Sequence, residues 1–235
     1  LSAMCTNDMG DTSKLSVLIG EAKAMGIDVL PPDINESRVN FAPARGGEVI
    51  RYGLAAIKGV GEAAVEAMLE ARDEGESFTS LNDLCHRVDL RAVNRKVLEA
   101  LIKAGACDGF GHTRASLVAQ IERTLSRASS DAADKARGQE TLFGMLDADQ
   151  PEADDIPAAL RNMAEWPNAE KLAHEKELLG FYVSGHPLEP FLGLIDSYAT
   201  HSVSQLAELP GRTIVRVAGL VSEGRRGISR KTDQP

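Results

Sequence analysis

The sequence is poor in cysteine and in aromatic residues, and it has no long apolar run. Its three cysteines, Cys5, Cys85 and Cys107, are odd in number and widely spaced, which disfavours a disulfide scaffold or a CxxC zinc site and favours a reducing cytosol. An aromatic content of 4% gives little support for a base-stacking surface. No stretch approaches the ~18 apolar residues of a membrane span, and no signal-peptide pattern opens the chain. We therefore expect a cytoplasmic protein that does not contact a membrane.

The composition is otherwise that of a globular chain of one or two domains, with 235 residues, 43% of them hydrophobic and 26% charged. The net charge of −9 argues by itself against nucleic acid as a partner, but the charge is unevenly distributed. Residues 86–127 carry eight basic and four acidic groups and residues 212–235 carry six and two, so each stretch has a net charge of +4. A polyanion could meet these basic stretches while the acidic ones stay solvated. Because the chain opens on Leu1 rather than on methionine, we expect a piece of a longer protein.

Apolar periodicity predicts a mainly α fold with small β elements, of the α+β class. Gly26 stands where the first helix should end, and Ser80 and Asn94 stand where N-caps are expected. The acidic stretch 147–155 has the composition of a linker. Helices are expected over residues 14–25, 54–58, 62–72, 81–88, 95–104, 113–128, 170–179 and 188–198, and strands over 27–30, 39–41, 49–52 and 213–221.

The best-formed motif is the turn Gly59-Val60-Gly61 between two of the expected helices. Two glycines allow a tight turn, and the amides at the following helix N-terminus, with the helix dipole behind them, favour an anion. Lys58 adds a positive charge directly before the turn. This is the chemistry of a helix-hairpin-helix, which holds a DNA phosphate without reading bases. Two alternatives are a turn without a ligand and a GxGxxA dinucleotide site, although the latter needs a buried strand before the glycines.

A second glycine–apolar–glycine turn, Gly109-Phe110-Gly111, lies between the next two expected helices. Asp108 stands where the first turn has its lysine, but Arg114 could supply a charge for phosphate. The alternative is a plain helical turn.

A third signal is the string Gln139-Glu140-Thr141-Leu142-Phe143 at the edge of the acidic linker. Its two bulky apolar residues have little nearby to pack against, so they could insert into a groove of a partner protein while Gln139 forms hydrogen bonds. The alternative is a helix end that docks on its own domain. The five histidines show no metal-ligand spacing, and no arrangement of nucleophile and base stands out, so no catalytic or metal site and no cofactor is expected.

Taken together, six stretches resemble the alpha subunit of bacterial DNA polymerase III, the replicative polymerase. They follow one another in the order of that family and span nearly the whole chain. They are GDTSKL (10–15), MGIDVLPPDIN (25–35), RYGLAAIKGVGEAAVEAMLEAR (51–72), NRKVLEALIKAGACD (94–108), QETLF (139–143) and LGFYVSGHPLEPF (179–191).

The resemblance implies a division of the chain. Residues 1–52 would be the end of the fingers, 53–127 the helix-hairpin-helix part of the clamp-binding domain, 128–155 the clamp-binding motif and linker, 156–205 a helical connector, and 206–235 the first strands of a truncated OB-fold. The metal-binding aspartates of the family lie upstream, so Mg²⁺ is implied for the parent DNA-directed DNA polymerase and not for this segment.

The resemblance also implies partners and site residues. The partners are duplex DNA, the sliding clamp and other subunits of the polymerase III holoenzyme. DNA backbone is expected at Lys58, Gly59, Val60, Gly61, Glu62, Gly109, Gly111 and Arg114, and the clamp at Gln139, Leu142 and Phe143. The alternative is a free-standing helix-hairpin-helix module of repair or recombination, but the finger-like residues 10–35 have no role in such a module.

Overall fold

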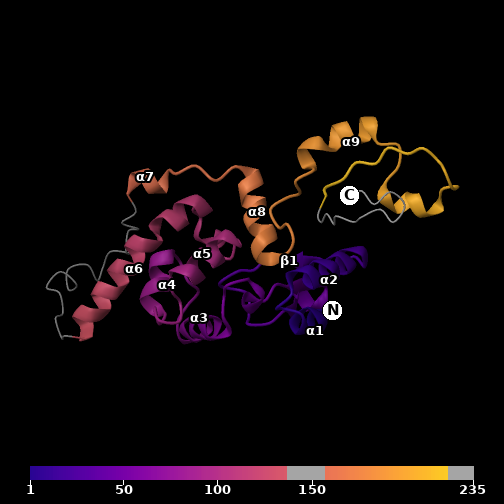
Figure 1. Cartoon of the computed structure of the whole chain (residues 1–235). Coiled ribbons are helices and arrows are strands. Elements are labelled where there is room, and N and C mark those ends of the chain that lie inside the picture. Colours follow the sequence, from indigo (N-terminus) through magenta and orange to yellow (C-terminus); the bar gives the residue numbers. More distant parts are fainter. Residues whose placement is uncertain (137–156, 222–235) are drawn as a thin grey trace, which may run out of the picture. The chain divides into compact units, whose positions relative to one another are not determined.

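The structure is a computed structural model that describes residues 1–136 and 157–221. The chain forms two compact units, Leu1–Ser184 and Gly185–Pro235. The boundary between the two units lies after Ser184, because residues up to Ser184 pack with the sequence before them. It therefore falls inside the connector expected over 156–205. The mainly α fold with a small β part is confirmed (Figure 1).

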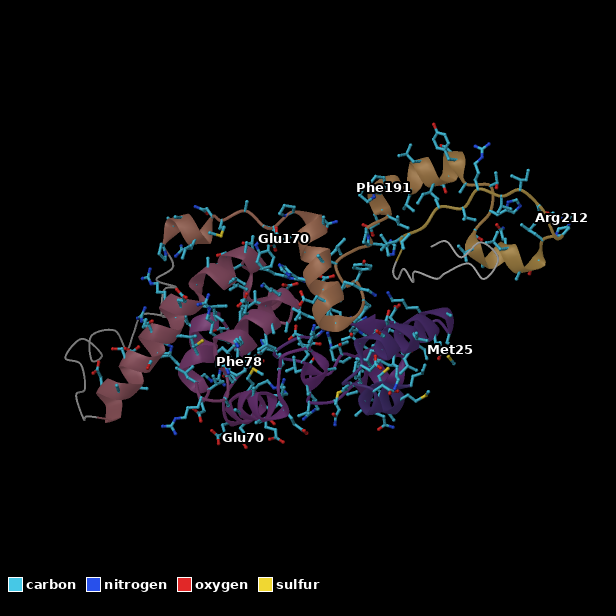
Figure 2. All side chains as sticks on the ribbon, in the orientation of Figure 1. Met25, Glu70, Phe78, Glu170, Phe191 and Arg212 are labelled. Atoms are coloured by element: carbon cyan, nitrogen blue, oxygen red, sulfur yellow. The ribbon has the colours of Figure 1, made fainter. Side chains whose placement is uncertain are left out.

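The first unit opens with two helices, α1 (Ser2–Asn7) and α2 (Thr12–Ala24). Asp11 caps α2, its carboxylate accepting from the amides of Ser13 and Lys14 at 3.0 and 3.1 Å. Gly26 follows with a φ of +77°, which confirms its expected position after the helix. In Figure 2 the side chain of Met25 lies at the end of α2, where it is exposed.

Three short strands form one sheet in the order β1-β3-β2. They are β1 (Val29–Leu30), β2 (Ala42–Ala44) and β3 (Val49–Arg51), with β1 parallel and β2 antiparallel to β3. The strand expected over 39–41 is therefore displaced by three residues. The reason is a tertiary contact: the carbonyl oxygens of Arg38 and Val39 accept from the amides of Leu54 and Ala55. This stretch therefore forms hydrogen bonds with the 3₁₀ turn at 54–56 instead of joining the sheet.

Helices follow the sheet and bury most of the apolar side chains. They are the 3₁₀ turn η2 (Leu54–Ala56), α3 (Glu62–Glu74), α4 (Leu81–Arg87), α5 (Arg95–Lys103), η3 (Asp108–Phe110) and α6 (Arg114–Ala136). Ser80 and Asn94 cap α4 and α5 as expected. The α-helix expected over 54–58 is wrong, because the chain leaves the 3₁₀ turn at Ile57, whose ψ of 122° is extended.

Helix α6 packs against α4 and α5, and α5 also packs against α8 (Asn168–Leu179). The short α7 (Ala158–Arg161) contacts α6. Phe78 is buried beside these helices, whereas Glu70 lies on the outer side of α3 (Figure 2). We call residues 163–184, which run along this helical body and contain α8, the strap.

The second unit contains η4 (Glu189–Phe191), α9 (Leu192–Tyr198) and η5 (Val203–Glu208). The strand expected over 213–221 is not present; this stretch instead meets the unit through the carbonyl oxygen of Arg216, which accepts from the amide of Thr200 at 2.9 Å. The buried hydrophobic residues of the described chain all lie at or before Phe181, whereas Phe191, Tyr198 and Ile214 are exposed. The alternating apolar residues of 213–221 therefore have no buried core to pack against in the described part of this unit.

Candidate nucleic-acid interface

The first hairpin turn joins η2 to α3 through a left-handed glycine. Gly59 has a φ of +88°, a conformation that costs an L-residue strain, and it places Lys58 and Gly61 on the surface. Val60 between the glycines is 5% exposed, so its side chain anchors the turn in the core. The sequence pattern therefore predicted the shape of this turn correctly.

Not every amide of the turn is available to a ligand. The amide of Lys58 donates to the carbonyl oxygen of Leu178 at 3.0 Å, and that of Val60 donates to the carbonyl oxygen of Ile57 at 3.0 Å. Both amides are therefore already used within the fold, and a contact of Lys58 with phosphate would go through its side chain. The open donors belong to the start of α3.

Helix α3 begins at Glu62 without a side-chain cap on its N-cap residue, Gly61. In the first turn of a helix the amides have no partner within the helix, and the dipole places partial positive charge there. A Cβ atom added to Gly61 would meet nothing within 4 Å, so the space before this turn is open. The carboxylate of Glu62 would repel a phosphate, and only its backbone amide fits the role expected of this residue.

Lys58 supplies a cation beside these amides. Its side chain is exposed, and its Nζ atom lies 4.0 Å from Oε1 of Glu177, which is exposed as well. An ion pair of this kind contributes little, because water screens both charges. The lysine therefore remains able to meet an anion from solvent.

The second turn, Gly109-Phe110-Gly111, also contains a left-handed glycine, but the arginine expected beside it is not at the surface. Gly111 has a φ of +75° and ends η3, and Gly109 is exposed. The residue expected to bring the charge, Arg114, is only 2% exposed. The sequence does not distinguish a surface arginine from a buried one at this position, since both follow a turn at a helix start.

The guanidinium of Arg114 is held by carboxylates from two segments, Asp108 of η3 and Glu175 of α8. It donates to both carboxylate oxygens of Asp108 at 2.8 and 2.7 Å and to Oε1 of Glu175 at 2.9 Å, and also to the carbonyl oxygen of Lys103. Burial alone would lower the pKa of Arg114, but these bonds to Asp108 and Glu175 outweigh it and raise the pKa. Arg114 is thus committed to the fold, and this geometry contradicts its expected contact with phosphate.

Glu175 is completely buried on α8 and completes this cluster. Its Oε2 atom accepts from the amides of Val183 and Ser184 at 2.7 and 2.9 Å, and its Oε1 atom accepts from the hydroxyl of Ser184. Burial would raise the pKa of Glu175, yet the bonds from Ser184, Val183 and Arg114 lower it. The sequence held a signal for this role, because Glu175 lies on the buried stripe between Leu172 and Leu179, where an apolar residue is expected.

Further contacts join the strap to the rest of the first unit. The carboxylate of Glu165 accepts from the amides of Arg114 and Ala115 at 3.1 and 3.2 Å and so caps α6. The hydroxyl of the buried Tyr52 donates to the carbonyl oxygen of Leu179 at 3.3 Å. A Cβ atom on Gly180, whose φ is +85°, would stand 2.4 Å from the carbonyl oxygen of Thr12. The strap therefore holds both hairpin turns and α2 in one unit.

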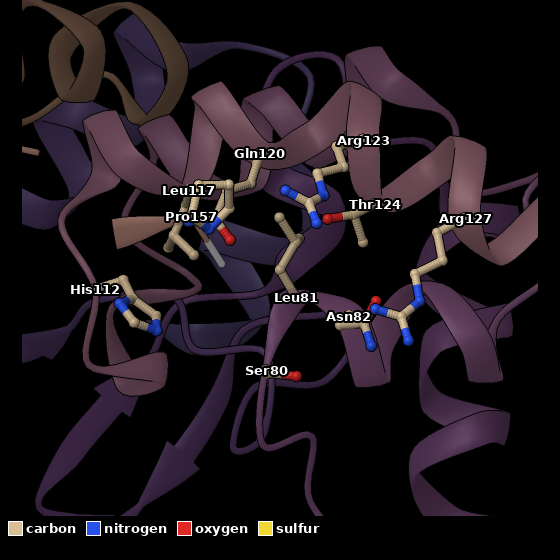
Figure 3. Close-up of a pocket in the computed structure, with 10 residues that line it drawn as sticks. All are labelled: Ser80, Leu81, Asn82, His112, Leu117, Gln120, Arg123, Thr124, Arg127 and Pro157. Atoms are coloured by element: carbon tan, nitrogen blue, oxygen red, sulfur yellow. The ribbon is translucent and has the colours of Figure 1, made fainter. Parts of the chain in front are cut away.

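A pocket between α4 and α6 lies apart from the expected site residues (Figure 3). It contains two arginines and no carboxylate, and Figure 3 shows Arg127 pointing toward Asn82 and Arg123 toward Thr124. Both arginines already have interactions of their own. The lining residues are Ser80, Leu81, Asn82, His112, Leu117, Gln120, Arg123, Thr124, Arg127 and Pro157.

Gln139, Leu142 and Phe143, the residues expected to bind the clamp, lie outside the described residues. Across 1–136 and 157–221, no three His, Cys, Asp or Glu side chains gather closely enough to hold a metal ion. The same residues include no helix with the length and hydropathy needed to cross a bilayer.

Comparison with known proteins points to one family. Residues 26–117 match the model of a helix-hairpin-helix motif. The DNA polymerase III subunit alpha of Vibrio cholerae is 40% identical over 225 residues, which cover 96% of this chain and 19% of that protein. The same subunit of Escherichia coli K12 is 38% identical and that of Pasteurella multocida 36%, each match covering 98% of this chain and 20% of the relative.

The chain thus spans about one fifth of the length of the curated relatives it matches. The similarity nevertheless extends over almost all of its own residues, including the hairpin, the strap and the second unit. The matches carry one protein name across several bacteria. The chain therefore belongs to the family of DNA polymerase III alpha subunits, of which it represents one segment.

Proposed function

We propose that this chain is a segment of a replicative DNA polymerase that holds the backbone of duplex DNA at its first hairpin turn. The observation that carries the proposal is the uncapped start of α3, open to solvent, with the exposed Lys58 beside it. The match to a helix-hairpin-helix motif over residues 26–117 and the names of the relatives support it. They favour it over a free-standing module of repair or recombination.

Contacts of this kind position a protein on DNA without reading its sequence. Backbone amides and one lysine offer hydrogen bonds and charge to phosphate oxygens, and they reach no base edge. Basic residues of the stretch 86–127 would add contacts, so that about 2–4 phosphates are met in all. Affinity should then be no better than about 10⁻⁴–10⁻⁶ M, with a log–log salt slope of roughly −2 to −4. The net charge of −9 weakens binding further.

The test is fluorescence anisotropy of a labelled duplex titrated with the chain over a range of salt concentrations. Lys58→Ala should weaken binding about equally on unrelated sequences and reduce the salt slope by about one. Lys14→Ala is the matched control, because Lys14 is also exposed but lies on α2 with Asp8 3.4 Å away. Strong dependence on sequence, or equal effects of the two substitutions, would refute the DNA-binding hairpin.

We further propose that Gln139, Leu142 and Phe143 bind a sliding clamp. Leaving two bulky apolar side chains in water costs about 1.5–3 kcal/mol each, and a groove on a partner would recover much of it. Leu142→Ala with Phe143→Ala should abolish binding to a bacterial clamp and leave the unfolding temperature and DNA affinity nearly unchanged. Gln139→Ala should have a smaller effect. Unfolding of the double variant, or unchanged clamp binding, would contradict this role.

The parent protein would be the DNA-directed DNA polymerase, acting with other holoenzyme subunits and Mg²⁺, and this segment would perform no nucleotidyl transfer. Primer extension with Mg²⁺ and nucleotides tests the latter point. Elongation by the pure chain would refute it.

A further inference from the structure

We propose that two residues from distant elements set the phosphate affinity of the first hairpin with opposite signs: Lys96 of α5 strengthens it and Glu177 of α8 weakens it. The inference rests on the proposed function and adds to the hairpin two side chains that the glycine motif does not contain. Both positions follow from how α5 and α8 pack around the turn.

Helix α5 passes directly beside the turn. A Cβ atom added to Gly59 would lie 4.0 Å from the Cβ atom of Ala100, so this part of α5 touches the hairpin. Lys96 precedes Ala100 by four residues and therefore lies on the same face of the helix, about 5–6 Å away between Cβ atoms. Its side chain is exposed.

Lys96 forms no ion pair with any other residue that the structure describes, whereas Lys103 on the same helix binds Glu99 at 2.6 Å. Its charge is thus available to a phosphate held at the start of α3. Together with Lys58 it would place two cations near the open amides.

The side chain of Arg95, next to Lys96 on α5, points to a different surface. Consecutive residues of an α-helix point about 100° apart, and Arg95 forms an ion pair with Glu122 of α6. The two adjacent cations therefore serve different surfaces: Arg95 faces α6 and Lys96 faces the hairpin side. This makes Arg95 a matched control for Lys96.

Glu177 is held beside the turn by its neighbour. The carbonyl oxygen of Leu178 accepts the amide of Lys58 at 3.0 Å, which fixes the end of α8 at the hairpin, and Oε1 of Glu177 lies 4.0 Å from Nζ of Lys58. A phosphate bound to Lys58 would thus come within the Debye length of this carboxylate, about 10 Å at 0.1 M salt. Glu177 therefore both competes for the lysine and repels the ligand.

The experiment compares the whole chain with Lys96→Gln, Arg95→Gln, Glu177→Gln and Lys58→Gln, using anisotropy of a labelled duplex at about 50 mM salt and a salt titration. Lys96→Gln should weaken binding about threefold and reduce the salt slope by about 0.9. Glu177→Gln should strengthen binding about twofold, and Arg95→Gln should change it less than about 1.5-fold. Circular dichroism and unfolding temperature confirm that each exposed substitution leaves the fold intact.

The outcomes separate this inference from the proposed function. Suppose that the parent chain binds duplex DNA and Lys58→Gln weakens this binding. If Lys96→Gln then changes the affinity no more than Arg95→Gln does, or Glu177→Gln does not raise it, the roles of Lys96 and Glu177 are refuted and the proposed function of the hairpin remains. If the parent chain does not bind duplex DNA, or Lys58→Gln has no effect, the proposed function itself fails.

Discussion

Glu175→Ala tests whether the buried ion pair between α6 and α8 holds the strap to the helical body. In the folded chain the guanidinium of Arg114 is 2% exposed and Glu175 is completely buried, with 2.9 Å between Nη1 and Oε1. Removing one partner of a buried pair costs about 3–5 kcal/mol, because the other charge stays buried. Asp108 still binds Arg114 in the variant, so we expect the lower end, about 3 kcal/mol.

Urea unfolding followed by the fluorescence of Trp166 measures this cost at the strap. Trp166 is the one tryptophan of the chain, and its ring centroid lies 5.0 Å from that of His174 on α8. Glu177→Ala is the control, because Glu177 lies two residues further on the same helix but is exposed. Loss of less than about 1 kcal/mol in Glu175→Ala, or equal losses in the two variants, would refute the role of the Arg114–Glu175 ion pair in holding the strap.

Two further predictions concern acid stability and the hairpin turn. Because hydrogen bonds lower the pKa of Glu175 below its ordinary value of 4.5, its stabilisation is present above about pH 4.5 and is lost as the pH falls through the folded pKa. In acid titrations at fixed urea, Glu175→Gln should therefore lose less stability below pH 4.5 than the parent chain, and an equal slope would contradict this. Gly59→Ala should cost about 1–2 kcal/mol because its φ is +88°, whereas Gly61→Ala, at a φ of −78°, should cost less than about 1 kcal/mol. Thermal unfolding compares the two alanine variants, and equal shifts would show that the left-handed turn is not required.

Local features of this fold could be predicted from sequence, because the residues concerned lie next to the feature they cause. Gly26 ends a helix, and Ser80 and Asn94 begin two others, as their neighbours indicated. The shape of the turn at Gly59 was equally predictable, since only a few adjacent residues determine it.

Features that depend on distant partners could not be predicted in the same way. Arg114 looks like a surface cation until Glu175, 61 residues later, is placed beside it. The amide of Lys58 looks open until Leu178 covers it. At residues 213–221 the alternation of apolar residues was present, but the described part of the second unit provides no buried core to receive them.

The strap also bears on the order in which this unit can form during protein synthesis. Lys58 and Leu178 are 120 positions apart, and ribosomes add about 5–20 residues per second, so roughly 6–24 s pass between them. During that interval the amide of Lys58 lacks its carbonyl acceptor, and Arg114, once it has been added, lacks Glu175 for a further 61 residues. The turn can form this hydrogen bond only after α8 has left the ribosome. A nascent chain halted before α8 should therefore be cleaved by proteases at the hairpin more readily than one halted after Ser184.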